Sequence, residues 1–251
     1  KEHELTKDQR IAIRLPADGQ YLVVGAPGTG KSVVALMRLR KYATTNETLF
    51  LSYNHVLNHA NKVLAGADEN FHMNTAMSWL YDFQYKVAGG SQANFEQAKM
   101  PEIENHKPDY EALINRFEDL GASCPSTNFI IDEGQDLPPE WYEAVEALNV
   151  ENFFIVADQN QQITEENSLQ ADLLDALGLE KDDLIHLKEN WRNTTPISAF
   201  ANYFYTDKSS EKPALPKKPS AHVPILYEYK MLESAKELIL SSYDNDPSKL
   251  I

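Results

Sequence analysis

The sequence predicts an α/β fold, in which a parallel sheet carries helices on both faces. Three observations favour this fold. Short apolar runs typical of buried strands alternate with stretches of helical apolar spacing. A glycine-rich loop joins one of these strands to the helix that follows it. Polar and acidic side chains follow several of the apolar runs, as expected where the carboxyl ends of parallel strands form a ligand site.

Six apolar runs are the candidate strands, at residues 20–25, 47–53, 70–75, 127–133, 152–158 and 183–189. We expect the main domain to span residues 1–207. Residues 81–126 are polar and mostly helical in pattern, which predicts a small helical insertion. Proline and lysine crowd residues 208–224, as in an extended linker. Residues 225–251 show one strand pattern and one helix pattern, which predicts the start of an incomplete second domain.

Length and composition are those of an ordinary globular protein. The chain has 251 residues, of which 42% are apolar and 24% are charged. No apolar stretch is long enough to span a membrane, and residues 1–10, KEHELTKDQR, do not resemble a signal peptide. A single cysteine, Cys124, excludes an internal disulfide. We therefore expect a cytoplasmic protein without a membrane partner.

The charge is unevenly distributed. The net charge of −15 argues at first against a nucleic-acid partner. However, residues 1–66 contain 9 basic and 5 acidic side chains, whereas the remainder contains 14 basic and 33 acidic side chains. The excess of acidic side chains is densest in residues 132–183, which contain 15 acidic side chains and one lysine. Any nucleic acid should approach the N-terminal third, and the acidic stretch is either a solvated surface or a docking face for another protein.

The loop VVGAPGTGKS, residues 23–32, matches the pattern G-x-x-x-x-G-K-[ST]. Its glycines let backbone N–H groups point inward at an anion, and the helix N-terminus adds partial positive charge. Lys31 can reach the outer phosphates of a nucleoside triphosphate, and the Ser32 hydroxyl can bind Mg²⁺. The alternative is a glycine turn that matches by chance. The nucleotide-binding candidates in this loop are Gly25, Ala26, Pro27, Gly28, Thr29, Gly30, Lys31 and Ser32.

The run NFIIDEGQD ends a predicted strand in two adjacent carboxylates, Asp132 and Glu133. A carboxylate at a strand tip can hold Mg²⁺ opposite Ser32, usually through water. The neighbouring Glu133 can orient or deprotonate the water that attacks the γ-phosphate. By itself this pair is weak evidence, because acidic residues often begin loops. Together with a phosphate loop about a hundred residues upstream, it indicates a site for ATP and Mg²⁺.

Two further strand ends carry polar side chains. Asp158 and four amides follow the run FFIVA, and amides can sense whether a γ-phosphate is present. The alternative is a polar loop after a buried strand. In the run LKENWRNTTPI, Arg192 could bind phosphate through two N–H groups and Trp191 could stack on a flat ligand. The alternative there is a core tryptophan beside a surface arginine.

The order of these stretches resembles that of the motifs of UvrD-like superfamily 1 DNA and RNA helicases. The resemblance rests on LTKDQRIAI, GAPGTGKS, FLSYNHVL, MNTAMSWL, IIDEGQDLPPEW, VADQNQQI and LKENWRNTTPI, and covers about residues 5–205. The branch related to nuclease-related-domain helicases is most similar. The resemblance implies a RecA-like P-loop NTPase fold, with ATP and Mg²⁺ as cofactors and single-stranded DNA, or alternatively RNA, as partner.

The resemblance also implies roles for matching positions. Gln9 would read the adenine edge, and Trp191 would stack on the adenine. Arg192 would touch the γ-phosphate, while Gln135 and Gln161 would couple the γ-phosphate to the strand-binding surface. The catalytic set would then be Lys31, Glu133, Gln161 and Arg192, and the metal set Ser32 and Asp132. The path of the single strand would be lined by Ser52, Asn54, His55, Thr75, Ser78 and Trp79.

The sequence also departs from the family pattern. Ala157 replaces a usual glycine, Thr164 stands where an aromatic residue often stacks on a base, and Met77 stands where histidine is frequent. The predicted insertion is far shorter than the accessory domain of large repair helicases. The motifs of the second RecA-like domain, which normally supplies an arginine across the ATP cleft, are missing. We therefore expect a motor-domain fragment that binds ATP–Mg²⁺ but hydrolyses it slowly.

Three functional classes remain open on the sequence alone. The first is the ATP-binding motor portion of an ATP-dependent helicase or translocase that tracks single-stranded nucleic acid. The second is a nucleotide-switched interaction module that never translocates. The third is a small-molecule or nucleoside kinase, in which the DEGQD and NWRN stretches would have no task.

Overall fold

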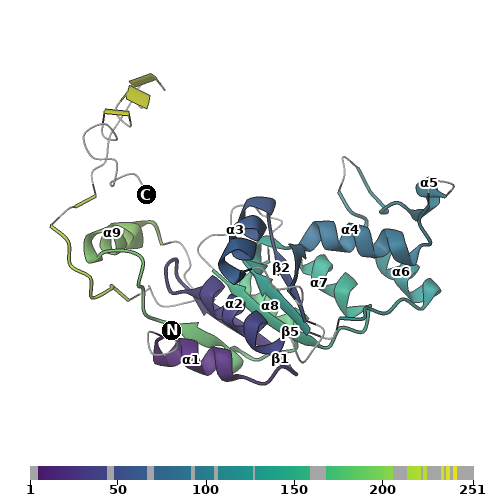
Figure 1. Ribbon diagram of the computed structural model, residues 1–251, viewed down its shortest axis with the longest axis horizontal. Coiled ribbons are helices and arrows are strands. Elements are labelled where there is room, and N and C mark those ends of the chain that lie inside the picture. The colour runs from purple at the N-terminus through teal and green to yellow at the C-terminus, as the bar shows by residue number, and fades with distance from the viewer. Residues whose placement is uncertain are drawn as a thin grey trace.

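A six-stranded parallel sheet forms the centre of the computed structural model (Figure 1). The structure describes residues 5–43, 48–66, 71–91, 94–104, 107–126, 128–158, 168–205, 214–221, 223–224, 233–234, 236–237 and 240–241. All six predicted strands are present in these residues, and the predicted α/β fold is confirmed. The strands are β1 (Gln20–Gly25), β2 (Thr48–Ser52), β3 (His72–Thr75), β4 (Asn128–Asp132), β5 (Asn152–Ala157) and β6 (Ile185–Leu187).

The strand order is β3-β2-β4-β5-β1-β6, and each neighbouring pair is parallel. The chain therefore has to cross over between strands, and helices make these connections. The register places Ser52 of β2 beside both Asp132 of β4 and Thr75 of β3. The ends of these three strands consequently lie in one row at the carboxyl edge of the sheet.

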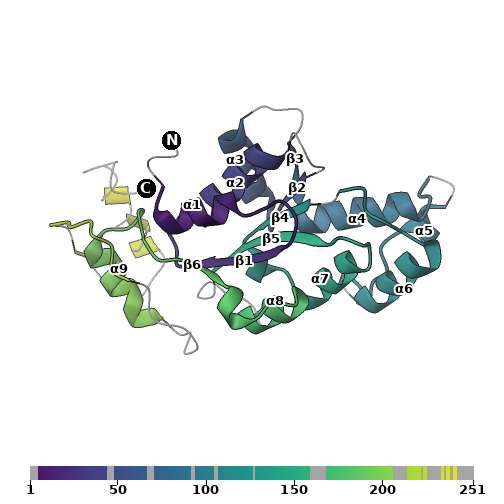
Figure 2. The same cartoon turned by 90° about the horizontal axis from the view of Figure 1, so that it is seen from below.

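Helices cover both faces of the sheet, as Figure 2 shows from below. One face packs against α1 (Lys7–Arg14), α2 (Lys31–Tyr42) and α3 (His55–Ala65). The other packs against α4 (Ala76–Val87), α6 (Tyr110–Leu120), α7 (Pro139–Glu146) and α8 (Gln170–Ala176). Neighbouring strand residues alternate between the two cores: Ile130 faces the first set of helices, whereas Phe129 and Ile131 face the second. The central strands β2, β4 and β5 are mostly apolar because both of their faces are buried.

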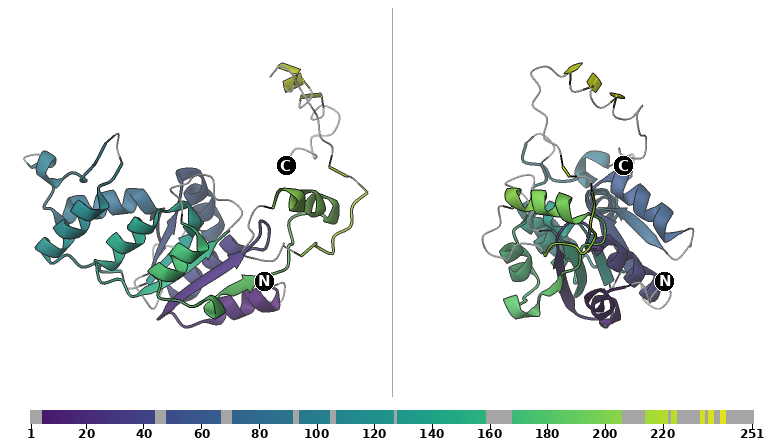
Figure 3. Two further views of the ribbon diagram at one scale, coloured as in Figure 1. Left: turned by 180° about the vertical axis from the view of Figure 1, so that it is seen from behind. Right: turned by 90° about the vertical axis from the view of Figure 1, so that its left-hand side faces the viewer.

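The predicted helical insertion contains α4, the short α5 (Phe95–Ala98) and α6. Helix α4 begins at Ala76, five residues before the predicted start of this segment, directly after β3. The segment shares the core of the sheet, because Leu80, Leu113 and Phe117 are buried in the same cluster as Phe129 and Trp141. Its helices form the end of the molecule opposite α9 (Figure 3).

The C-terminal part begins with α9 (Thr195–Ala201) and the 3-10 turn η4 (Asn202–Phe204). Within the predicted linker, the backbone carbonyl of Lys218 accepts a hydrogen bond of 2.8 Å from the backbone N–H of Thr195. The predicted strand at residues 225–229 lies outside the described residues, while residues 233–234, 236–237 and 240–241 are helical. The domain boundaries stay predictions. No helix in the described part of the chain combines the length and apolar character needed to cross a membrane.

Candidate nucleotide-binding site

The glycine-rich loop connects the end of β1 to the start of α2, at the carboxyl edge of the sheet. Gly28 and Gly30 have φ angles of 86° and 84°, in the left-handed region that favours glycine. Gly30 is the N-cap of α2, so no capping side chain blocks the first-turn N–H groups of this helix. Inside the loop, the Thr29 hydroxyl donates to the carbonyl of Ala26 at 2.8 Å. The loop therefore has the geometry of an anion cradle.

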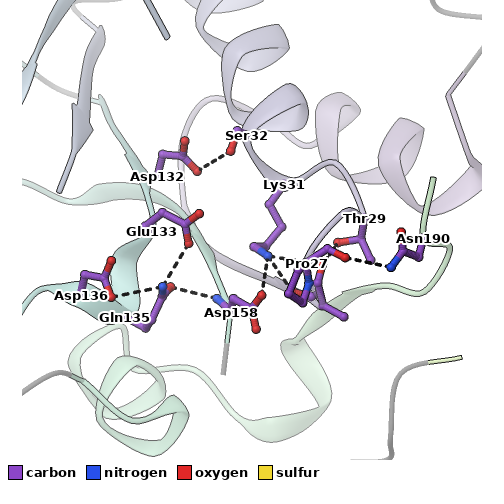
Figure 4. A network of polar contacts seen from close by, with 12 residues as sticks. Pro27, Thr29, Lys31, Ser32, Asp132, Glu133, Gln135, Asp136, Asp158 and Asn190 are labelled. Carbon is purple, nitrogen blue, oxygen red and sulfur yellow. Dashed lines mark hydrogen bonds and ion pairs between the residues drawn. The ribbon is translucent and has the colours of Figure 1, made fainter. Parts of the chain in front are cut away.

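Lys31 is the first residue of α2 and is only 6% exposed. Its Nζ donates to the carbonyl oxygens of Gly25 at 2.8 Å and Ala26 at 3.4 Å. It also forms an ion pair of 3.1 Å with Oδ2 of Asp158, which follows β5. The lysine ammonium is thus folded back over the loop, and Figure 4 shows it pointing toward Asp158.

Ser32 and Asp132 meet although they are far apart in the sequence. Ser32 Oγ donates to Asp132 Oδ1 at 3.1 Å, and Asn61 Nδ2 of α3 donates to Asp132 Oδ2 at 3.1 Å. Asp132 is fully buried, and burial, together with the nearby Glu133 charge, raises its pKa to about 6. These two hydrogen bonds and the Lys31 charge oppose the rise.

The residues around Asp132 fit a magnesium ion. A serine hydroxyl and a carboxylate side by side supply the hard oxygen ligands that Mg²⁺ prefers, and a cation would favour the charged form of Asp132. The described residues contain no cluster of three His, Cys, Asp or Glu side chains that could hold a metal by themselves. Phosphate and water oxygens would therefore have to complete the coordination, as is usual for Mg²⁺ bound with a nucleotide.

Glu133 follows β4 in a left-handed conformation, with φ 58° and ψ 48°. This conformation is uncommon for a residue with a side chain and often marks a functional site. Glu133 Oε2 accepts a hydrogen bond of 3.0 Å from Gln135 Nε2, which also lies 3.4 Å from Asp136 Oδ1. Gln135 Oε1 accepts from the backbone N–H of Asp158 at 2.9 Å. The buried Gln135 side chain therefore links Glu133 to the end of β5 (Figure 4).

The segment after β6 docks on the glycine-rich loop. Asn190 Nδ2 donates to the carbonyl of Pro27 at 2.9 Å, and the backbone N–H of Trp191 donates to the carbonyl of Gly28 at 2.9 Å. Asn190 Oδ1 accepts from the backbone N–H groups of Arg192 and Asn193. Trp191 is 60% exposed and Arg192 is exposed as well. The structure thus brings both predicted residues to the rim of the loop and leaves their side chains accessible.

Gln9 lies in α1 and also contacts the glycine-rich loop. Its Nε2 donates to the carbonyl of Thr29 at 2.8 Å, and its Oε1 accepts from the backbone N–H of Thr6 at 2.9 Å. Because the Thr6 hydroxyl accepts from the Gln9 backbone N–H, the pair forms a capping box that fixes the start of α1. Gln161 lies outside the described residues.

The predicted nucleic-acid residues are buried (Ser52 and Thr75), partly buried (Ser78 and Trp79) or exposed (Asn54 and His55). Ser52 and Thr75 are buried at the ends of β2 and β3, and Thr75 caps α4 and bonds to Ser78. Trp79 packs its ring against those of Phe129 and Trp141, with centroids 5.0 and 6.3 Å away. Asn54 caps α3, and it is exposed together with His55. The structure brings only Asn54 and His55 of this set to the exposed surface.

Sequence reasoning missed Asn61 and Asn190 as parts of the site. Asn61 lies inside an ordinary helical pattern, and nothing in the sequence connects it with Asp132. Asn190 precedes the motif pair Trp191–Arg192 directly after a strand, a position that could have drawn attention to it.

Comparison with solved structures gives distant likenesses. The crystal structure of Bacteroides Pif1 bound to ssDNA has a TM-score of 0.43 and 14% identity, over 80% of this chain and 47% of that chain. Pif1 helicase from Candida albicans has a TM-score of 0.44 and 15% identity, over 75% of this chain and 40% of that chain. The PRRSV helicase has a TM-score of 0.42 and 14% identity, over 79% of this chain and 36% of that chain.

This chain therefore spans less than half the length of each of these proteins. No protein-family model matches the chain, and no curated protein matches it either. Likenesses this distant do not bear on chemistry, so the functional argument rests on the site itself.

Proposed function

We propose that this chain is the ATP-binding motor portion of an ATP-dependent nucleic-acid translocase or helicase of the UvrD-like kind. The observation that supports it most is the convergence of Lys31, Ser32, Asp132 and Glu133 at one edge of the sheet, from sequence positions about 100 residues apart. A phosphate loop beside a buried carboxylate and a second, accessible carboxylate is the arrangement that nucleotide hydrolysis needs. A kinase would leave the Gln135 connection between Glu133 and the end of β5 without a task.

Each side chain of the site has a defined role in this proposal. The loop N–H groups and Lys31 bind the phosphates, and Ser32 and Asp132 hold Mg²⁺, which neutralises charge on the reacting phosphate when bound. Glu133 orients the attacking water and accepts its proton, while Gln135 holds the Glu133 carboxylate through Nε2. Gln9 and Trp191 hold the adenine, and Arg192 with Gln161 contacts the γ-phosphate.

Single-stranded nucleic acid is the second ligand in the proposal. It would pass along the carboxyl edge of β2 and β3, where Asn54 and His55 are exposed. A second RecA-like domain would complete the ATP cleft with an arginine, so this chain by itself would turn over slowly.

The first test is nucleotide binding. We expect fluorescent ATP to bind in the presence of Mg²⁺, and Lys31→Ala to weaken binding by at least tenfold, since it removes a charged phosphate contact worth about 1.5–3 kcal/mol. Lys86→Ala, which removes an exposed lysine on α4, is the matched control and should bind normally. Equal ATP affinity in the wild type and Lys31→Ala would contradict the proposal.

The second test separates a motor from a nucleotide-switched interaction module. Single-stranded DNA should bind in a salt-dependent way and accelerate ATP hydrolysis by the full-length protein. ATP binding without any response to DNA or RNA would instead favour the interaction module.

A further inference from the structure

The Lys31 ammonium has a full set of acceptors in this structure. An ammonium has three N–H donors, and three oxygens surround Nζ: the carbonyls of Gly25 and Ala26 and the carboxylate of Asp158. Of these three acceptors, Asp158 alone carries a charge. A phosphate that approaches Lys31 must therefore displace or share one of them, and the carboxylate is the acceptor that repels it.

Asp158 is built into the site rather than lying near it by chance. It is 1% exposed, and its backbone N–H donates to Gln135 Oε1 at 2.9 Å. The other end of the Gln135 amide donates to Glu133 Oε2 at 3.0 Å. One continuous chain of polar contacts thus runs from Lys31 through Asp158 and Gln135 to Glu133 (Figure 4).

We propose that Asp158 is a positioning residue that competes with the outer phosphates of the nucleotide for Lys31 and transmits the exchange to Glu133 through Gln135. This inference rests on the proposed function, in which Lys31 binds those phosphates. When phosphate oxygens take over the ammonium, the carboxylate of Asp158 loses its attraction to Lys31 and is repelled by the new anion. Because the Asp158 backbone is bonded to Gln135, a shift of Asp158 changes the position of the amide that holds Glu133.

The decisive variant is Asp158→Asn, which keeps the shape and an acceptor for Lys31 but removes the charge. It leaves the backbone N–H bond to Gln135 available. We expect pyrophosphate, ADP and ATP to bind about fivefold more tightly, because a neutral competitor is weaker than a charged one by about 1 kcal/mol. AMP, which lacks the outer phosphates, should bind with unchanged affinity.

Three further variants separate positioning from general structure. Asp175→Asn removes an exposed acid from the same acidic stretch and should leave all affinities unchanged. Gln135→Met breaks the connection to Glu133 and should lower kcat about tenfold, while pyrophosphate affinity stays within about twofold of the wild type. Asp158→Glu, which keeps the charge, should not tighten binding.

Calorimetric titration of each variant, with thermal unfolding as a check on folding, decides the matter. If Asp158→Asn does not fold, Asp158→Ser makes the same test with a smaller side chain. Unchanged or weaker pyrophosphate binding in the folded variant, with binding still lost in Lys31→Ala, would overturn this inference and leave the proposed function standing. Normal binding by Lys31→Ala would refute the proposed function itself.

Discussion

At the scale of single residues, the notable feature of the site is a carboxylate that the fold holds in an unfavourable environment. Asp132 is fully buried at the end of β4, and its pKa of about 6 reflects burial first and the neighbouring Glu133 charge second. Among the described residues, its hydrogen-bond donors are two neutral side chains, Ser32 and Asn61. Such an arrangement costs stability and is typical of a group that is kept for binding or catalysis.

We therefore expect Asp132→Asn to stabilise the protein while it damages the site. Removing the buried charge should raise the free energy of unfolding by about 1–3 kcal/mol at pH 7 without nucleotide, since one pKa unit corresponds to about 1.4 kcal/mol. Urea denaturation measures this change, and Asp175→Asn is the control for loss of an exposed acid. The same variant should lose the Mg²⁺ dependence of ATP binding. A variant less stable than the wild type would show that the charge of Asp132 supports the fold.

At the scale of elements, the sequence predicts the strands well and their contacts poorly. The central strands β2, β4 and β5 are predictable because each is a short, mostly apolar run buried on both faces, as in NFIID of β4. The glycine-rich loop is predictable because its chemistry is local. By contrast, Asn61 lies 71 residues from Asp132, and Asn190 lies 163 residues from Pro27. These contacts depend on which strands become neighbours, and local patterns do not contain that order.

The packing of the partly buried Trp79 is also not visible in the sequence. Trp79 matches a motif position expected at the nucleic-acid path, yet its ring packs against Phe129 and Trp141. The aromatic residues that it packs against come from β4 and α7, which follow it by some 50 residues or more in the chain. The roles assigned to the motif residues stay predictions.

The contact between the glycine-rich loop and the segment after β6 gives a further prediction. A Cβ at Gly28 would meet Asn190 Oδ1 at 2.6 Å and Arg192 Cβ at 2.8 Å. Gly28→Ala should therefore displace Trp191 and Arg192, weaken ATP binding, and destabilise the protein by more than backbone strain alone, which costs about 1–2 kcal/mol.

Gly66 is the matched control, because its φ is 85° and nothing lies within 4 Å of a Cβ built there. Gly66→Ala should show the backbone cost without any effect on nucleotide affinity. Thermal unfolding and ATP titration of both variants check the prediction, and equal effects on affinity would contradict it.

At the scale of the whole molecule, two carboxyl groups with raised pKa values make the stability of the fold depend on pH. Asp132 and Asp136 both have a pKa of about 6, raised by burial first and by the Glu133 charge second. In the unfolded chain their pKa is near the ordinary value of 3.8. Between these values the folded state binds more protons, so these two groups make the protein less stable as the pH rises from about 4 to about 6.

Asp136→Asn tests this dependence. The variant should lose part of the decline in thermal midpoint between about pH 4 and pH 6 and should be more stable than the wild type above pH 6. Asp175→Asn, which removes an exposed acid of α8, should keep the slope of the wild type. If the thermal midpoint of Asp136→Asn declines with pH as steeply as that of the wild type, the Asp136 carboxyl does not contribute to the pH dependence of stability.

The common register of β3, β2 and β4 has a consequence for energy transfer. Thr75, Ser52 and Asp132 sit side by side on three adjacent strands, so the ends of this row are separated by only two inter-strand spacings, or about 10 Å. A movement of Asp132, the metal ligand in our proposal, would reach Thr75 through the hydrogen bonds between two pairs of neighbouring strands. In the proposed motor, the nucleotide site and the nucleic-acid path would therefore adjoin the same three strand ends, and a short rigid connection would be enough to couple them.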